Sequence, residues 1–486
     1  MSAEKVAVDH PPASDPETGS NSENAPPLDT RKLLMKLDLR ILPVLSLAYL
    51  FAFLDRVNIG NAAVFGLSKE LNLKGTQYNF ALCIFFIPYI LLEIPSNALL
   101  KKIKPHRFLS GCIFMFGLTT VLQGLVTSYG GLLATRFFLG AFETGLFPGA
   151  FYLLSMWYRR EESQSRFSFF FISTTLASAF GGLLASAIGK MDGVRGMLAW
   201  RWIFILEGTM TCVFAIGSYF TIPDFPEDVK WLNEQEREWV ITRLRGDVGS
   251  SGRETPAVKW KDLKVIFTDY KYILGAVMYL GFIVPAYGFS YFAPTIIKGW
   301  NYTPIEAQLR TVPVAMVAWV LAMATAYASD WMKHRYWFII FCSSITVIGF
   351  AVLMTTHGNR AVQYGGLFMS YPGAFSAMPL VVCYFQTNLA GHTRRSIGSA
   401  FQISFGNLGG VIATFIFLAK DGPYYVTGYS VCIAFTILTM VTSTFYVIGI
   451  RRENKLREAG LAGIVVENEE DEGEIGDMSR KFRYIL

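Results

Sequence analysis

Four ionisable residues interrupt two apolar stretches that are otherwise long enough to cross a membrane. Asp55 and Arg56 are adjacent in the first stretch, and Arg136 and Glu143 lie on the fourth. A charge near the centre of a bilayer costs about 2.5 to 3.5 kcal/mol on insertion scales, so we expect such residues to have a use. Guanidinium groups bind carboxylates, and carboxyl groups exchange protons. The four residues therefore indicate transport of a charged molecule.

Helix geometry places these charges at related depths. A helix that rises 1.5 Å per residue through the first stretch puts Asp55 about 21 Å above the inner membrane boundary. The fourth stretch descends, so Arg136 lies at a matching depth and can pair with Asp55 if the two helices are neighbours. Arg136, Gly140 and Glu143 follow the spacing of one helix face, which we expect to line a cavity.

The positions of Arg56 and Glu143 indicate two functional roles. Arg56 has no assigned partner, and its planar cation is suited to hold a carboxylate of the substrate. Glu143 falls near the midplane, where a low dielectric favours the neutral carboxyl, so we expect it to carry a proton near neutral pH. The alternative is that all four residues form a static ion-pair network. We favour the functional interpretation because buried ion pairs seldom add stability over apolar packing.

Composition indicates a membrane protein. Of the 486 residues, 52% are hydrophobic and only 16% are charged. The apolar residues gather in about twelve runs of roughly 20 residues, each long enough to cross the hydrocarbon as a helix. The runs begin near Arg40, Tyr78, Phe108, Gly131, Gln164, Ala199, Tyr272, Arg310, Tyr336, Ala361, Ser396 and Thr427. The sequence therefore predicts an all-α membrane protein of about twelve transmembrane helices in two pseudo-symmetric six-helix halves.

The chain divides at a polar segment in its middle. We predict a disordered cytosolic tail at 1–38, a six-helix bundle at 39–222, a cytosolic linker at 223–270, a second six-helix bundle at 271–450 and a cytosolic tail at 451–486. The linker contains WLNEQEREWVITRLR, which predicts an amphipathic helix, followed by the flexible GDVGSSGRETP. Matching half-chains with substrate bound between them are typical of repeat-built transporters.

The net charge is +6, and the basic residues fall at alternate ends of the apolar runs. By the positive-inside rule, both termini are cytosolic and the number of helices is even. We therefore expect a multi-pass membrane protein without a nucleic-acid partner. The plasma membrane is the favoured location, and a vacuolar or other membrane is the alternative. We also expect it to be a monomer.

The histidines and cysteines argue against catalysis. All five histidines lie in predicted tails or loops, and all six cysteines lie inside apolar runs without a CxxC motif. No metal-ligand or nucleophile set is apparent inside the membrane, so a membrane-embedded enzyme or receptor is the least favoured interpretation. We expect no enzymatic activity, no cofactor and no metal.

Several polar residues in other helices could contact substrate. Gln402 and Asn407 lie in FQISFGNLGG and either contact substrate or bridge helices. Tyr287 could line the outer half of the cavity, although packing is the commoner role of such a residue. The C-terminal half has no ionisable residue in the middle of a helix. We therefore expect that half to supply a neutral, aromatic wall.

Six stretches of the N-terminal half and one of the C-terminal half carry a family resemblance. They are FLDRVNIGNA (53–62), EIPSNALLKK (93–102), RFFLGAFETGLFPG (136–149), WYRREESQSR (157–166), WRWIFILEG (200–208), PDFPEDVKWL (223–232) and ASDWMKHR (328–335). In these stretches the chain resembles the major facilitator superfamily, and within it the fungal branch of the anion:cation symporter family. The turn after the second helix departs from the superfamily pattern, because Asn97 replaces the usual acid. Glu93, one turn earlier, could take its place.

The resemblance implies proton-coupled uptake of a small organic anion by alternating access. The substrate would be a carboxylate such as nicotinate, allantoate, pantothenate or a similar compound. Asp55 and Glu143 would couple protons, Arg56 and Arg136 would bind the anion, and Tyr89 resembles a tyrosine that lines the substrate cavity. Asp330 and Arg335, in the turn after the eighth helix, would act as a gate. The alternative is export of an acidic secondary metabolite, which the same buried charges would serve.

Overall fold

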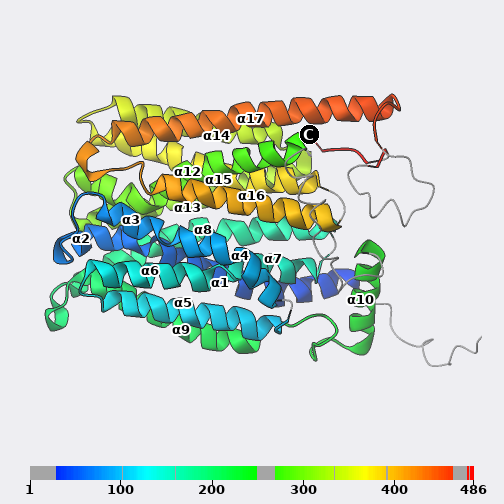
Figure 1. Ribbon diagram of the computed structural model, residues 1–486, viewed down its shortest axis with the longest axis horizontal. Coiled ribbons are helices and arrows are strands. Elements are labelled where there is room, and N and C mark those ends of the chain that lie inside the picture. The colour runs from blue at the N-terminus through cyan, green and yellow to red at the C-terminus, as the bar shows by residue number, and fades with distance from the viewer. Residues whose placement is uncertain are drawn as a thin grey trace, which may run out of the picture.

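The computed structural model describes residues 29–100, 102–158, 160–248, 269–332, 334–389, 392–463, 479–480 and 482–485. In these ranges the secondary structure is helical and no β-strand occurs. Most helices lie side by side along the long axis of the molecule (Figure 1). Nine helical segments of the described chain are long and apolar enough to cross a membrane. The predicted fold class, an all-α membrane protein, is confirmed.

The N-terminal half consists of six rods, by which we mean single long helices or two consecutive helices that continue one another. They are α1 (Thr30–Val64), α3 (Gln77–Cys83) with α4 (Phe86–Leu100), α5 (Pro105–Gly124), α6 (Tyr129–Glu143) with α7 (Leu146–Ser155), α8 (Arg160–Ile188) and α9 (Ala199–Thr221). A short helix, α2 (Leu67–Glu70), follows α1. Two rods are broken after a few turns, and one of these breaks directly follows Glu143, the last residue of α6.

The C-terminal half also consists of six rods. They are α12 (Tyr270–Gly299), α13 (Pro304–Met332), α14 (Tyr336–Thr355), α15 (Arg360–Thr387), α16 (His392–Ala413) and α17 (Val426–Glu458). The helices of this half are drawn in green to orange in Figure 1, above the blue and cyan helices of the first half. The two halves thus contain equal numbers of rods, as the sequence predicts.

The boundary of the N-terminal tail differs from the prediction. Helix α1 begins at Thr30, with Leu33, Leu37 and Ile41 buried, so residues 30–38 are helical and not part of a disordered tail. The apolar side chains at helical spacing explain why the helix extends beyond the predicted start. Residues 1–28, the rest of the predicted tail, lie outside the described residues.

The linker contains the expected helix. Helix α10 (Glu234–Val248) lies across one end of the bundle, which we call the linker end (Figure 1). Lys36 Nζ of α1 donates to Glu236 Oε1 at 2.9 Å. Burial raises the pKa of Glu236, but hydrogen bonds from Lys36 and the backbone of Asn233 outweigh it and hold this pKa below its ordinary value. The linker helix is thereby tied to the first helix. The segment 249–268 lies outside the described residues.

The outer surface of the rods is apolar. On α9, Val213, Ile216 and Phe220 are largely exposed, and on α17 Phe445 and Ile448 are exposed as well. In water such a surface would be costly, whereas lipid tails solvate it without penalty. These faces therefore contact the bilayer.

In the described residues the two halves meet where α1 packs on α12, α8 on α13 and α15, and α3 and α4 on α16. At the end opposite the linker, Lys298 Nζ of α12 donates to the carbonyl of Val64 on α1 at 2.7 Å. The backbones of α1 and α12 approach closely at Gly60, where a Cβ would clash with the carbonyl of Tyr291. This close contact between α1 and α12 requires glycine at position 60.

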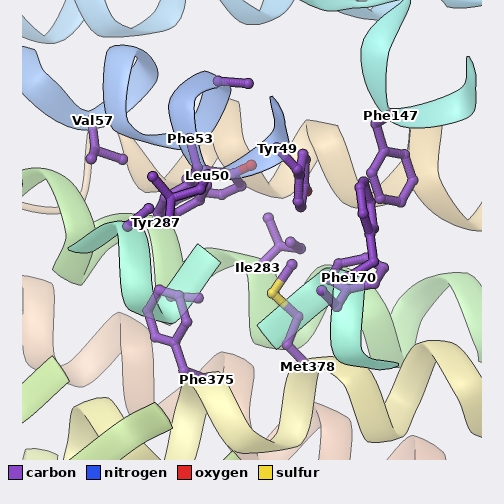
Figure 2. Close-up of a cluster of buried hydrophobic side chains, with 14 of the residues drawn as sticks. Tyr49, Leu50, Phe53, Val57, Phe147, Phe170, Ile283, Tyr287, Phe375 and Met378 are labelled. Atoms are coloured by element: carbon purple, nitrogen blue, oxygen red, sulfur yellow. The ribbon is translucent and has the colours of Figure 1, made fainter. Parts of the chain in front are cut away.

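Aromatic side chains fill the junction closer to the linker end. Figure 2 shows Tyr49 and Phe53 of α1 and Phe170 of α8 facing Phe375 and other residues of the second half. The rings of Tyr49 and Phe170 stack at 4.6 Å, and those of Phe53 and Phe375 meet edge to face at 6.4 Å. This packing lies between Arg56 and the linker end, so it must open before a substrate can pass.

The end of the chain binds back onto the second half through its backbone. Tyr484 N donates to Asn454 Oδ1 and Asn454 Nδ2 donates to Tyr484 O, both at 3.0 Å. Asn388 makes the same two-way contact with Ile485, at 2.8 and 3.0 Å. Two asparagines, at the end of α15 and on α17, thus hold the C-terminal segment of residues 482–485.

The side chain of Tyr484 is buried at the linker end. Its hydroxyl accepts from Lys271 Nζ at 2.9 Å and from Arg457 Nη2 at 2.8 Å. Both cations also lie over the tyrosine ring, at 4.9 and 4.5 Å from its centroid. The ring therefore joins the start of α12 to the end of α17.

We expect Tyr484→Ala to destabilise the second half and release the C-terminal segment. Loss of a buried aromatic side chain costs about 3 to 5 kcal/mol, and Lys271 and Arg457 would each lose a hydrogen bond and a ring contact. The thermal unfolding midpoint should fall, and trypsin should cleave after Arg480 and Arg483 much faster. Tyr484→Phe is the control that keeps the ring. An unchanged cleavage rate in Tyr484→Ala would contradict a docked segment.

Candidate transport site

Arg56 lies at the junction of the halves and is fully enclosed. Its guanidinium pairs with Glu143 of α6, where Nε donates to Oε1 at 3.0 Å and Nη2 also donates to Oε1. On the other side, Nη1 donates to the hydroxyl of Tyr287 on α12. One cation therefore contacts an acid of the first half and a tyrosine of the second.

Three aromatic rings surround the same guanidinium. Its central carbon lies 4.9 Å from the ring centroid of Phe85, 5.0 Å from Tyr89 and 5.7 Å from Tyr287. Cation-π contacts of this kind stabilise a desolvated arginine without neutralising its charge. The structure thus brings the predicted residues Tyr89 and Tyr287 to Arg56, from different halves.

The pairing of the buried charges differs from the expectation. Arg136 Nη1 donates to the backbone carbonyl of Arg56 at 2.9 Å. Asp55 is 1% exposed, and neither of its carboxyl oxygens accepts a hydrogen bond from the described residues. The expected Asp55 to Arg136 ion pair is therefore not among the contacts formed, and the pair that forms is Arg56 with Glu143. Depth along the helix axis alone does not fix which face of the helix a side chain occupies.

The residues expected on α16 differ in their contacts. Gln402 Nε2 donates to the carbonyl of Gly275 on α12 at 3.2 Å, so it bridges two helices. The amide nitrogen of Asn407 is buried without a hydrogen-bond partner among the described residues. Of the two, only Asn407 keeps an unused donor.

The two residues predicted to act as a gate form an ion pair in the turn between α13 and α14. Arg335 Nη2 donates to Asp330 Oδ1 and Nη1 donates to Thr387 Oγ1 at the end of α15, both at 2.9 Å. In the matching turn of the first half, the side chain of Asn97 lies outside the described side chains. Glu93, one turn earlier, accepts from Ser404 of α16 at 2.9 Å. It thereby joins the two halves.

A further buried acid, Glu207 on α9, was missed by the sequence interpretation. Asn58 Nδ2 of α1 donates to its Oε2 at 2.5 Å, and its Oε1 has no partner among the described residues. The signal was present, because Glu207 is an isolated acid within the apolar run that begins at Ala199.

A cleft lies between the halves, next to Arg56 and towards the end opposite the linker. Its lining has no charged side chain and includes Asn61 of α1, Ser178 of α8, Ser290 of α12, Thr311 of α13 and Tyr371 of α15. Such a lining offers hydroxyl and amide groups among apolar surface. It suits the uncharged part of a small molecule.

Comparison with known proteins identifies the family. Residues 45–414 match the Major Facilitator Superfamily. The chain belongs to this superfamily. Among its relatives, the MFS-type transporter cnsO of Penicillium expansum is 35% identical, and the alignment covers 94% of this chain and 90% of that protein. The high-affinity nicotinic acid transporter of Saccharomyces cerevisiae is 31% identical, with 88% and 79% covered.

The fold of this MFS transporter is also found among solved structures. A bacterial homolog of the human lysosomal transporter Spinster, crystallised in an inward-facing and unoccupied conformation, superposes with a TM-score of 0.63. The match covers 84% of this chain and 95% of the other, at 14% identity. At that identity the likeness concerns the fold alone.

Proposed function

We propose that this MFS transporter is a proton-coupled symporter of the anion:cation symporter type, which takes up a small organic carboxylate. Nicotinate, allantoate and pantothenate are the candidate substrates. The observation that carries the proposal is the contact of Arg56 with both Glu143 and Tyr287. Because Arg56 contacts both halves, a substrate that binds to it changes a contact of each half.

The ion pair suggests how proton and anion binding are linked. While Glu143 is ionised, it occupies two donors of the Arg56 guanidinium and competes with a substrate carboxylate. When Glu143 takes up a proton, this competition weakens and the substrate carboxylate can pair with Arg56 in its place. Proton and anion would then bind together. The loaded site would have a smaller net charge than the site with the anion alone, which eases movement through the membrane.

The other site residues have supporting roles in this proposal. Asp55 provides a second proton-binding group, Arg136 holds the backbone of Arg56 in place, and Tyr89 and Tyr287 wall the site. Asn407 would donate to the substrate through its amide nitrogen and Gln402 would accept through its oxygen, both unused within the described chain, while the Asp330 to Arg335 pair gates the linker end.

The proposal also covers orientation and location. Basic residues gather at the linker end, for example Lys36 and Arg40 on α1 and Arg451 and Arg452 on α17. By the positive-inside rule the linker end and both termini face the cytosol. Uptake then runs from the opposite end of the bundle to the linker end, across the plasma membrane, through a monomer.

Transport into proteoliposomes tests this function. A potential that is negative inside opposes anion entry by about 2.3 kcal/mol per charge per 100 mV, so a monocarboxylate needs at least one proton to enter as a neutral pair. We expect uptake of labelled nicotinate, allantoate or pantothenate to rise with an inward proton gradient. A protonophore should collapse it. Equal accumulation without a proton gradient, or accumulation driven by sodium alone, would refute proton symport.

A further inference from the structure

The membrane-embedded core of the first half contains more acids than cations. Its buried acids are Asp55, Glu93, Glu143 and Glu207, and its buried cations in the described residues are Arg56 and Arg136. Ionised carboxylates without counter-ions are costly in a dry interior, and the usual relief is uptake of a proton. The core must therefore hold protons even without substrate.

Among the described residues, Glu207 forms no hydrogen bond or ion pair with either arginine. Arg56 pairs with Glu143, and Arg136 contacts the backbone of Arg56. Glu207 is 0% exposed and its hydrogen-bond donor is the neutral amide of Asn58. Its second oxygen is unpartnered among the described residues. No ion pair within the described chain neutralises this carboxyl.

Asp55 is the charged group that acts on Glu207. Asn58, the donor to Glu207, follows Asp55 by one turn of α1. Thr211, one turn after Glu207 on α9, lies beside Asp55, as does Thr120 of α5. Both threonine hydroxyls donate to carbonyls of their own helices. Asp55 therefore lies one turn of α1 away from the residue that binds Glu207, where α1 packs on α9.

Other charged groups also lie near Asp55. Glu143 and Arg136 of α6 act on it, and Arg56 follows it on α1. Asp55 is therefore next in sequence to Arg56 of the substrate site and one turn of α1 before Asn58, which binds Glu207.

We propose that Asp55 and Glu207 hold one proton between them, so that the pair, and not Asp55 alone, is the second proton-binding site of the transporter. This inference rests on the proposed proton symport for its role in transport. Two neighbouring carboxylates resist double ionisation, and their protonation steps belong to the pair. The proton moves between carboxyl oxygens, and no other bond changes. Glu207 thereby sets the pH at which Asp55 binds and releases its proton.

Carbodiimide labelling tests the shared proton without relying on transport. Dicyclohexylcarbodiimide modifies protonated carboxyls in apolar surroundings, and mass spectrometry identifies each modified residue. In the purified wild-type transporter, labelling of Asp55 and Glu207 should rise together as the pH falls, with a common midpoint. In Glu207→Gln the midpoint for Asp55 should move to lower pH, because the neighbouring negative charge is gone. Half-maximal labelling of Asp55 should then need about a tenfold higher proton concentration. In Asp55→Asn the midpoint for Glu207 should move in the same direction.

Two control variants test whether the shift is due to the charge of Glu207. Glu207→Asp keeps the charge and should restore a common midpoint, and Ser218→Ala changes another buried residue of α9, hydrogen-bonded to Ser110, without moving either midpoint. If Glu207→Gln does not fold, Asp55→Asn still decides the question through the labelling of Glu207. Unmoved midpoints in both variants would overturn the proposal.

Uptake measurements separate this inference from the proposed function. The pH that gives half-maximal uptake should fall in Glu207→Gln together with the labelling midpoint of Asp55. Wild-type uptake could be independent of the proton gradient while the labelling midpoints still shift in Glu207→Gln and Asp55→Asn. That result would refute proton symport and support the shared proton. If uptake is driven by protons but neither midpoint nor uptake profile moves in Glu207→Gln, the shared proton fails and symport stands.

Discussion

Glu143→Gln is expected to abolish net uptake driven by a proton gradient while leaving exchange of substrate across the membrane partly intact. The amide oxygen of glutamine can still accept from Arg56, so the contact that places the guanidinium is retained in part. The amide cannot take up a proton, however, and net symport needs a proton to enter and leave. Exchange of one substrate molecule for another needs no net proton movement. Proteoliposomes preloaded with unlabelled carboxylate measure exchange, and empty ones with an acidic exterior measure net uptake.

Glu236→Gln is the matched control for this prediction. Glu236 also accepts from a basic residue of α1, Lys36, but it lies on the linker helix outside the transmembrane core. Its replacement should leave both net uptake and exchange near the wild-type level. Normal accumulation by Glu143→Gln under a proton gradient would show that Glu143 does not carry the proton.

The helices themselves were predictable from the sequence, because apolar runs of sufficient length must form helices in lipid. All twelve predicted starts lie in or next to an observed rod. The start of α1 was placed too late, since composition drew attention to the polar tail and away from Leu33 and Leu37, which already follow the helical spacing. Local pattern was the better guide at that boundary.

The positions of the buried charges along each helix were predictable, but their partners were not. Rise per residue gave Asp55 and Arg136 similar depths, and it could not say which way each side chain points around its helix. The contact of Arg136 with the backbone of Arg56, and the contact of Arg56 with Glu143, depend on how α1 and α6 are rotated and packed. These are tertiary properties.

Glu207 shows a different limit. It lies in an apolar run that also contains Arg201, so a charge at this position does not stand out by composition. Asn58 would not have drawn attention to it, because the two residues are separated by 149 positions in sequence and meet only when α1 packs on α9. The cost of burying an isolated carboxyl was the one signal available.

Arg56→Lys is expected to weaken substrate binding by about 1 to 3 kcal/mol, or roughly 5-fold to 150-fold in the dissociation constant. Lysine keeps the positive charge but loses the planar fork, which now reaches Glu143 on one side and Tyr287 on the other. A single ammonium cannot reproduce both contacts and the paired hydrogen bonds to a carboxylate. Binding of labelled substrate to the purified transporter measures the change directly.

Two further variants locate the origin of the loss. Tyr287→Phe removes only the hydroxyl that links Arg56 to the second half, so it should impair transport more than binding if this contact couples the halves. Arg201→Lys is the matched control, because Arg201 also pairs with an acid, Glu70, but lies at the end of the bundle opposite the linker end. This variant should bind substrate normally. If Arg56→Lys binds as tightly as the wild type, the fork is not used on the substrate. Arg56 would then serve the ion pair with Glu143 alone, and the anion would have to be held elsewhere.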